Sequence, residues 1–258
     1  MVPYLDLRRL HENRLPEIKK AIDRVLERGW YILGEELEAF EHEFAASLGV
    51  SHVAGVASGT DAIEIALRAL GVGPGDEVIA PANTCVPTIA GITASGAQPV
   101  LADIELETYA IDPASIRRAL TARTKAIVPV HLYGHPCDVD AIQDVIAGRD
   151  IVIMEDCAQA HGATYKDRPC GTLGAAAAFS FYPSKNLGAL GDAGAVVTRD
   201  EAAMGRVREL RNYGQRDRYT SVSEGVNSRL DEIQAVILRV LLVHLDESNA
   251  ARREQAHR

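Results

Sequence analysis

The segment Ile151-Val-Ile-Met-Glu-Asp156 has four consecutive apolar residues followed by two carboxylates. A strand that is apolar at every position is typical of a parallel sheet with both faces covered. The carboxylates then lie at the carboxyl end of the strand, where open α/β sheets bind ligands. Because successive side chains point to opposite faces, we expect one of Glu155 and Asp156 to face a site and the other to pair with a basic neighbour. Taken singly, either carboxylate could equally cap the next helix.

Segments of strand length alternate with segments of helical period on both sides of this stretch. The predicted strands are 52–57, 77–81, 99–103, 126–132, 151–155, 177–182 and 194–198. The predicted helices between them are 60–70, 86–95, 113–120, 139–146 and 201–211. This alternation predicts a three-layer α/β fold, a mostly parallel sheet covered by helices. Only residues 183–193 separate the last two strands, so we expect one of these strands to depart from the βαβ pattern.

The two ends of the chain differ from this central pattern. Two amphipathic helices, 16–28 and 35–48, precede the first strand. After Arg211 a polar segment leads into a long helical pattern that starts at Leu230 and shows no cap or turn signal before Arg258. We therefore expect residues 1–240 to form the N-terminal elements and one large domain. Residues 241–258 are expected to start a smaller C-terminal domain, the rest of which is missing.

Composition excludes several classes of protein. The apolar share of 47% and the charged share of 24% are ordinary for a globular protein. The net charge of −9 argues against a general nucleic-acid or anionic-membrane binder, because such proteins need a basic surface. There is no signal-peptide pattern and no apolar segment long enough to span a bilayer. The four cysteines form no C-x-x-C pair, so we expect reduced thiols and a cytoplasmic location.

The segment Val56-Ala-Ser-Gly-Thr-Asp61 lies where a predicted strand ends and a predicted helix begins. Ser58 and Asp61 have the spacing of a capping box, and Gly59 lets the backbone approach a ligand closely. The free amides and the positive end of the helix dipole favour a phosphate. Taken alone, this segment is better explained as a capped helix without any ligand.

The segment Phe179-Ser-Phe-Tyr-Pro-Ser-Lys-Asn186 leads from a strand through a proline to a lysine, and a Gly-rich loop follows. A lone loop lysine is usually a solvated charge, whereas one in a partly dry pocket can act as a Schiff-base nucleophile. A phosphate site, a strand-end carboxylate and such a lysine are together the parts that pyridoxal phosphate (PLP) requires. The lysine binds the cofactor, the carboxylate keeps the ring nitrogen protonated, and the helix start anchors the phosphate.

In these segments the sequence resembles the DegT/StrS family of sugar-nucleotide aminotransferases, which are PLP enzymes of fold type I. The resemblance covers essentially the whole chain, in order through residues 29–34, 81–85, 155–162, 179–186 and 225–234. It implies that Lys185 is the Schiff-base lysine and catalytic acid/base and that Asp156 is the partner of the pyridine nitrogen. The other cofactor-binding residues that it implies are Gly59, Thr60 and Ser180 at the phosphate, Gln159 and Cys85 at the ring, and Asn227.

Asn227 is expected to reach the cofactor of the neighbouring subunit, so the resemblance implies a homodimer with shared active sites. Cys85 departs from many relatives, which carry a stacking aromatic residue there. The implied reaction moves an amino group from L-glutamate (or glutamine) to a keto-sugar nucleotide, at C3 of a dTDP-linked keto-6-deoxyhexose. Because the family's dehydratases carry histidine in place of Lys185, the lysine favours a transaminase. The alternatives are a truncated PLP-binding protein without turnover and a dehydratase or regulator of the same family.

Two unrelated classes of function are not favoured. A metal hydrolase would have to use the scattered ligands His131, His135, Cys137, Cys157, His161 and Cys170. These residues show no recognised zinc spacing, so we predict no metal site. A dinucleotide enzyme is rejected because Gly71-Val-Gly-Pro-Gly75 follows a helix rather than a strand and contains no G-x-G-x-x-G.

Overall fold

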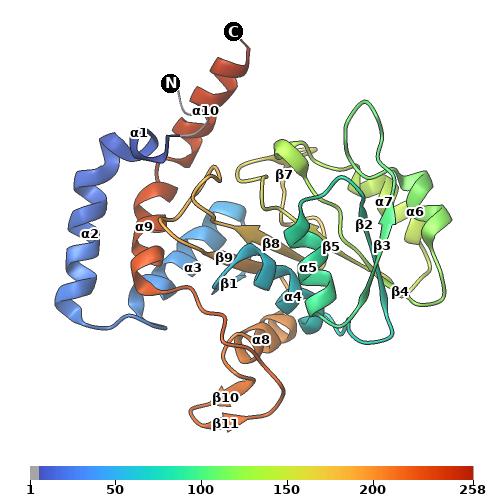
Figure 1. Cartoon of the computed structure of the whole chain (residues 1–258), viewed down its shortest axis with the longest axis horizontal. Coiled ribbons are helices and arrows are strands. Elements are labelled where there is room, and N and C mark those ends of the chain that lie inside the picture. The colour runs from blue at the N-terminus through green and yellow to red at the C-terminus, as the bar shows by residue number, and fades with distance from the viewer. Residues whose placement is uncertain (1–5, 258) are drawn as a thin grey trace.

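The computed structural model describes residues 6–257 and has a seven-stranded sheet at its centre (Figure 1). The strand order is β1-β9-β8-β5-β4-β2-β3. The strands span β1 His52–Val56, β2 Glu77–Pro81, β3 Gln98–Ala102, β4 Thr124–Ile127, β5 Val152–Asp156, β8 Ala176–Ser180 and β9 Gly194–Thr198. β5 lies in the middle of the sheet, parallel to its neighbours β4 and β8.

β9 is the strand that departs from the parallel pattern, since it pairs antiparallel with both β1 and β8. A parallel return needs a crossover, usually a helix, and no helix lies between β8 and β9. The strand predicted at 126–132 is shorter than expected and ends at Ile127. Pro129 has no N–H to continue the ladder, and the chain soon enters a 3₁₀ turn at Leu132–Gly134.

Helices cover both faces of the sheet, as the apolar strands predict. The side chain of Ile153 packs in a core cluster with α3 (Glu35–Leu48), α6 (Pro113–Ala119) and α7 (Val139–Ile146). The next residue, Met154, packs in a second cluster with α4 (Gly59–Ala69), α5 (Val86–Ala94) and α8 (Glu201–Leu210). Adjacent residues of one strand thus belong to opposite apolar layers, and the three-layer architecture is confirmed.

The prediction of one long helix from Leu230 to Arg258 is wrong. Asp231 caps a first helix, α9 (Glu232–Leu242), by accepting the backbone N–H of Gln234 at 2.8 Å. The helix then breaks at Val243 and His244 before α10 (Leu245–Ala256), and Arg258 lies outside the described residues. The break lets Leu245 reach the main core and lets Asn249 bind the carbonyl of His161. The division of the chain at residue 240 stays a prediction.

The first helices pack beside α9 (Figure 1). α2 (Leu15–Arg28) and α9 share a small apolar cluster, and α3 contacts α9 as well. Short elements that the sequence did not predict are α1 (Leu7–His11), a 3₁₀ turn at Glu12–Arg14 and the hairpins β6–β7 (Thr164–Tyr165, Arg168–Pro169) and β10–β11 (Gln215–Asp217, Thr220–Ser221). Within residues 6–257 every helix is too short or too polar to cross a membrane.

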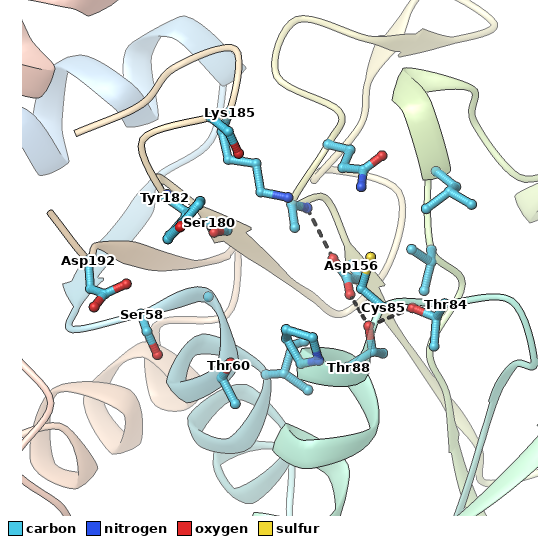
Figure 2. A pocket seen from close by; sticks show the side chains of 18 of the residues that line it. Ser58, Thr60, Thr84, Cys85, Thr88, Asp156, Ser180, Tyr182, Lys185 and Asp192 are labelled. Carbon is cyan, nitrogen blue, oxygen red and sulfur yellow. Dashed lines mark hydrogen bonds between the residues drawn. The ribbon is translucent and has the colours of Figure 1, made fainter. Parts of the chain in front are cut away.

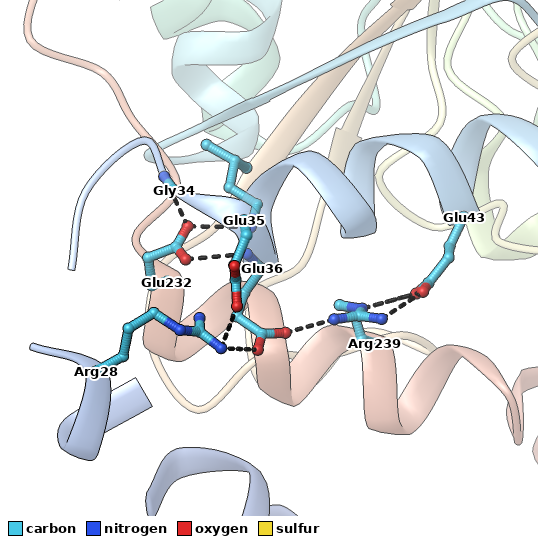
Figure 3. Close-up of polar contacts among 8 residues, drawn as sticks. Arg28, Gly34, Glu35, Glu36, Glu43, Glu232 and Arg239 are labelled. Atoms are coloured by element: carbon cyan, nitrogen blue, oxygen red, sulfur yellow. Dashed lines mark hydrogen bonds and ion pairs between the residues drawn. The ribbon is translucent and has the colours of Figure 1, made fainter. Parts of the chain in front are cut away.

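A polar network fixes the start of α3 against α9 (Figure 3). The carboxylate of Glu232, fully buried, accepts the backbone N–H groups of Gly34, Glu36 and Leu37 at 2.9–3.0 Å. The side chain of Glu36 pairs with Arg28 and with Arg239. Glu232 therefore acts as an N-cap supplied by a distant segment, because the N-cap residue of α3 is Gly34, which has no side chain to cap the helix.

Candidate active site

A cavity of about 470 Å³ lies at the carboxyl ends of β5 and β8, beside the start of α4 (Figure 2). Every predicted site residue except Asn227 lines it. The polar side chains and the glycine around the cavity are Ser58, Gly59, Thr60, Thr84, Cys85, Thr88, Asp156, Gln159, Ser180, Tyr182, Ser184, Lys185 and Asp192. The structure thus brings together the segments around Ser58, Asp156 and Lys185, although Ser58 and Lys185 are more than 120 residues apart in the sequence.

The start of α4 forms one end of the cavity. Ser58 caps the helix by accepting the backbone N–H of Asp61 at 3.1 Å. The next amides, Gly59 and Thr60, belong to the first turn and have no partner within the helix. A Cβ at Gly59 would lie 2.5 Å from the Cβ of Ser180, so only glycine allows β8 and α4 to meet here. Two helix amides and a serine hydroxyl therefore converge as an anion site.

Asp156 lies at the end of β5 and is only 3% exposed. Its Oδ2 accepts the hydroxyl of Thr88 at 2.7 Å, and its Oδ1 accepts the backbone N–H of Ala158 at 3.0 Å. Burial raises the pKa of Asp156, whereas these two hydrogen bonds and the charge of Lys185 act to lower it. A cation placed against this carboxylate would relieve the cost of burying it.

Thr88 was missed by the sequence prediction. Its hydroxyl bonds both to Asp156 and to the hydroxyl of Thr84, at 2.7 Å in each case. The only signal in the sequence is the i, i+4 spacing of the two threonines at the start of a helix. Because Thr84 precedes the helix, helical spacing does not place the two on one face, and it does not say what Thr88 contacts.

Lys185 enters the cavity from the loop after β8. Its backbone N–H donates to the carbonyl of Tyr182 at 2.8 Å. The loop then folds back so closely that a Cβ at Gly188 would lie 2.6 Å from the carbonyl oxygen of Pro183. Figure 2 shows the lysine side chain extending toward Asp156, with Ser58 and Thr60 on the far side of the cavity and Ser180 between them and the lysine. The amine, the carboxylate and the anion site are arranged around one space.

Two further predicted residues line the walls. The Oε1 atom of Gln159 accepts the backbone N–H of Tyr133 at 2.8 Å, which leaves the amide NH₂ as the group available to a ligand. Cys85 is exposed and occupies the N-cap position of α5. A thiol is soft and apolar but stacks less than an aromatic ring, so we expect a weaker contact with a flat ligand here.

Glu155 points away from the cavity and serves the fold. Its carboxylate accepts the ring Nε2–H of His131 at 3.0 Å and the backbone N–H groups of Gly171, Leu173 and Gly174 at 2.7–2.8 Å. The expected division of roles between the two adjacent carboxylates is therefore observed, with His131 as the basic neighbour.

His131, Glu155 and Cys157 come close enough together to resemble a metal site. However, the backbone N–H of Cys137 donates to the other ring nitrogen of His131 at 3.1 Å, so both ring nitrogens are engaged. Burial, with the nearby Glu155, raises the pKa of Cys157 well above its usual value, which favours a thiol over the thiolate that a metal needs. We therefore interpret the close approach of His131, Glu155 and Cys157 as a hydrogen-bonded part of the fold and not as a metal site.

Asn227 lies outside the cavity and is exposed, in a bridge with Asn212. Its predicted contact with the neighbouring subunit's cofactor stays a prediction.

Comparisons with known proteins match this arrangement. The model of the DegT/DnrJ/EryC1/StrS aminotransferase family matches residues 13–258. A dTDP-3-amino-3,4,6-trideoxy-alpha-D-glucose transaminase from Streptomyces venezuelae is 50% identical over 97% of this chain and 66% of its own length. The crystal structure of S. venezuelae DesV in complex with a ketimine intermediate has a TM-score of 0.92 and 51% identity, and the match covers 95% of this chain and 66% of that one.

A second similar structure contains a cofactor. NtdA from Bacillus subtilis with bound cofactor PMP has a TM-score of 0.89 and 35% identity, and the match covers 95% of this chain and 56% of NtdA. The chain thus spans about two thirds, or less, of the length of these relatives.

Proposed function

Because the chain belongs to the DegT/DnrJ/EryC1/StrS aminotransferase family, we propose that it is a PLP-dependent sugar-nucleotide aminotransferase. The amino donor is L-glutamate (or glutamine), and the acceptor is a keto-sugar nucleotide, with C3 of a dTDP-linked keto-6-deoxyhexose as the position aminated. The predicted family and fold are confirmed, while the roles of individual residues belong to this proposal.

One observation carries the proposal: Lys185, Asp156 and the start of α4 line the same cavity. Their chemistry fits the three polar ends of PLP. The amides of Gly59 and Thr60 with the hydroxyl of Ser180 would hold the phosphate, Asp156 would hold the ring nitrogen, and Lys185 would hold the aldehyde carbon. The buried position of Asp156 supports this assignment, since its carboxylate otherwise lacks a cationic partner in direct contact. Bound PLP supplies an electron sink for the bonds at the substrate's amine-bearing carbon.

Each residue has a defined task in the transfer. Lys185 would carry the proton to and from the substrate carbon, because it is the amine that extends into the cavity toward Asp156. Asp156 keeps the ring nitrogen protonated, and the hydrogen bond from Thr88 keeps that carboxylate in place. Gln159 would donate its amide NH₂ to the ring's 3-hydroxyl oxygen, since the backbone N–H of Tyr133 already occupies its carbonyl oxygen.

The substrate class follows from the relatives. The S. venezuelae relative, 50% identical, is named for a dTDP sugar with its amino group at C3. We extend this substrate to the present chain, together with a homodimer in which Asn227 reaches the partner's cofactor. The exposed position of Asn227 supports a role outside its own cavity.

The test follows both half-reactions with purified chain and PLP. L-Glutamate should yield 2-oxoglutarate in an amount equal to the active sites, and a dTDP-linked 3-keto-6-deoxyhexose should then sustain turnover. Lys185→Ala should abolish both, while Lys19→Ala, which removes an exposed lysine of α2, should leave both unchanged. PLP binding without any 2-oxoglutarate would instead identify a PLP-binding protein without turnover. Turnover that survives Lys185→Ala would refute the assignment.

A further inference from the structure

Residues 227–234, here called the strap, connect distant parts of the active site. The hydroxyl of Ser228 accepts the backbone N–H of Ala57 at 3.0 Å, at the end of β1. Glu232 caps α3, and the side chain of Gln234 accepts the backbone N–H of Leu190, in the loop after Lys185, at 2.9 Å. The strap thus fixes both the helix start that forms the anion site and the loop that carries the lysine.

The anion site has an acidic residue in its first turn. Asp61 follows Gly59 by two residues, and a free carboxylate at this place would repel a phosphate dianion a few ångströms away. Nevertheless Asp61 does not line the cavity, although Ser58, Gly59 and Thr60 do. Its Oδ2 accepts the hydroxyl of Ser228 at 2.6 Å. This hydrogen bond holds the carboxylate on the side of α4 that faces the strap.

We propose that Ser228 is a positioning residue for the cofactor's phosphate: it keeps the carboxylate of Asp61 directed away from the anion site. Ser228 suits this task because it is 1% exposed and its single hydroxyl is engaged on both sides, accepting from Ala57 and donating to Asp61. The inference rests on the proposed PLP site and adds to it a residue that contacts neither cofactor nor substrate.

The test compares two ligands that differ only in the phosphate. PLP and pyridoxal are titrated separately against wild type, Ser228→Ala, Asp61→Asn and the double variant, with binding followed by absorbance. Ser228→Ala should raise the Kd for PLP about tenfold, the scale of repulsion between two like charges a few ångströms apart near a protein surface. The Kd for pyridoxal should stay within about twofold. Adding Asp61→Asn to Ser228→Ala should restore PLP binding, because the repelling charge is gone.

Ser47→Ala is the matched control, because that hydroxyl only bonds to the carbonyl of Phe44 within α3. The inference is overturned if Ser228→Ala weakens PLP and pyridoxal equally, if it weakens neither, or if Asp61→Asn fails to restore binding. If Ser228→Ala does not fold, Asp61→Asn is tested by itself. Its Kd for PLP should equal that of the wild type or be lower, and a higher Kd would contradict the inference. If the wild type binds no PLP, the proposed function is refuted. If the wild type binds PLP but Ser228→Ala does not change the Kd, only the role of Ser228 is refuted.

Discussion

Glu155→Gln is expected to destabilise the fold severely while leaving the residues of the cavity in place. In the wild type, one carboxylate oxygen accepts the N–H groups of Leu173 and Gly174, and the other accepts those of Gly171 and His131. Glutamine has the same shape but replaces one oxygen by an NH₂ group, which cannot accept. Whichever way the amide turns, two buried donors lose their acceptor and face another donor.

The cost can be worked from this geometry. Each buried donor left unsatisfied costs about 1–3 kcal/mol, so two cost about 2–6 kcal/mol. Removing a buried charge recovers part of that, and we expect a net loss of about 2–4 kcal/mol. For a domain of this size a loss of 1 kcal/mol lowers Tm by roughly 2–4 °C, so Tm should fall by roughly 5–15 °C.

The assay is thermal unfolding followed by circular dichroism, with Glu107→Gln as the control because Glu107 is exposed. The control should change Tm by less than about 2 °C, since surface substitutions are usually within about 0.5 kcal/mol. A Tm for Glu155→Gln that matches the control would refute the reasoning that this carboxylate holds residues 171–174 against β5.

Three further outcomes are expected. Glu232→Ala should speed hydrogen exchange at the amides of Gly34, Glu36 and Leu37, because it removes both oxygens that accept them, and unchanged protection would contradict that role. His161→Phe should make the chain less sensitive to acid. Burial, and to a smaller extent the charge of Lys185, lowers the pKa of His161 to about 3. Between this pH and about pH 6.5, His161 therefore takes up a proton only in the unfolded wild type, which destabilises the native state. Wild type should therefore lose about 2 kcal/mol more than the variant between pH 7 and pH 5 in urea unfolding, and parallel losses would be the contrary result. Asp156→Asn without cofactor should raise Tm at pH 7. Burial raises the pKa of Asp156, so the wild-type native state loses stability as pH rises through that pKa, and asparagine avoids this loss. The gain in Tm should shrink toward pH 4, and a lower Tm of the variant at pH 7 would contradict the prediction.

The sheet was predictable because its physical cause is local. The unbroken apolar run of β5 requires cover on both faces, and Ile153 and Met154 indeed enter opposite clusters. The long C-terminal helix was mispredicted because a period of 3.6 continues across Val243 and His244. The reason for the break lies elsewhere in the chain, where Asn249 meets Asn186 and the carbonyl of His161.

The candidate site likewise contains residues that the sequence could identify and residues that it could not. The lysine, the strand-end carboxylate and the capped helix could be found because each has a local signature, and the three were expected in one place from the chemistry they share. Thr88 and Ser228 could not be found, since a hydroxyl that bonds to Asp156 or Asp61 leaves no pattern in its own neighbourhood. Their roles depend on sequence separations of 68 and 167 residues.

The proposed PLP site is best tested by the visible absorption spectrum of the chain with PLP, recorded before and after the addition of L-glutamate. We expect a band of protein-bound PLP that is absent in Lys185→Ala, present in the control Lys19→Ala, and lost on addition of glutamate as 2-oxoglutarate appears. A band that forms equally in Lys185→Ala, or no band in the wild type, would contradict the claim that the cavity around Lys185 and Asp156 is a PLP site.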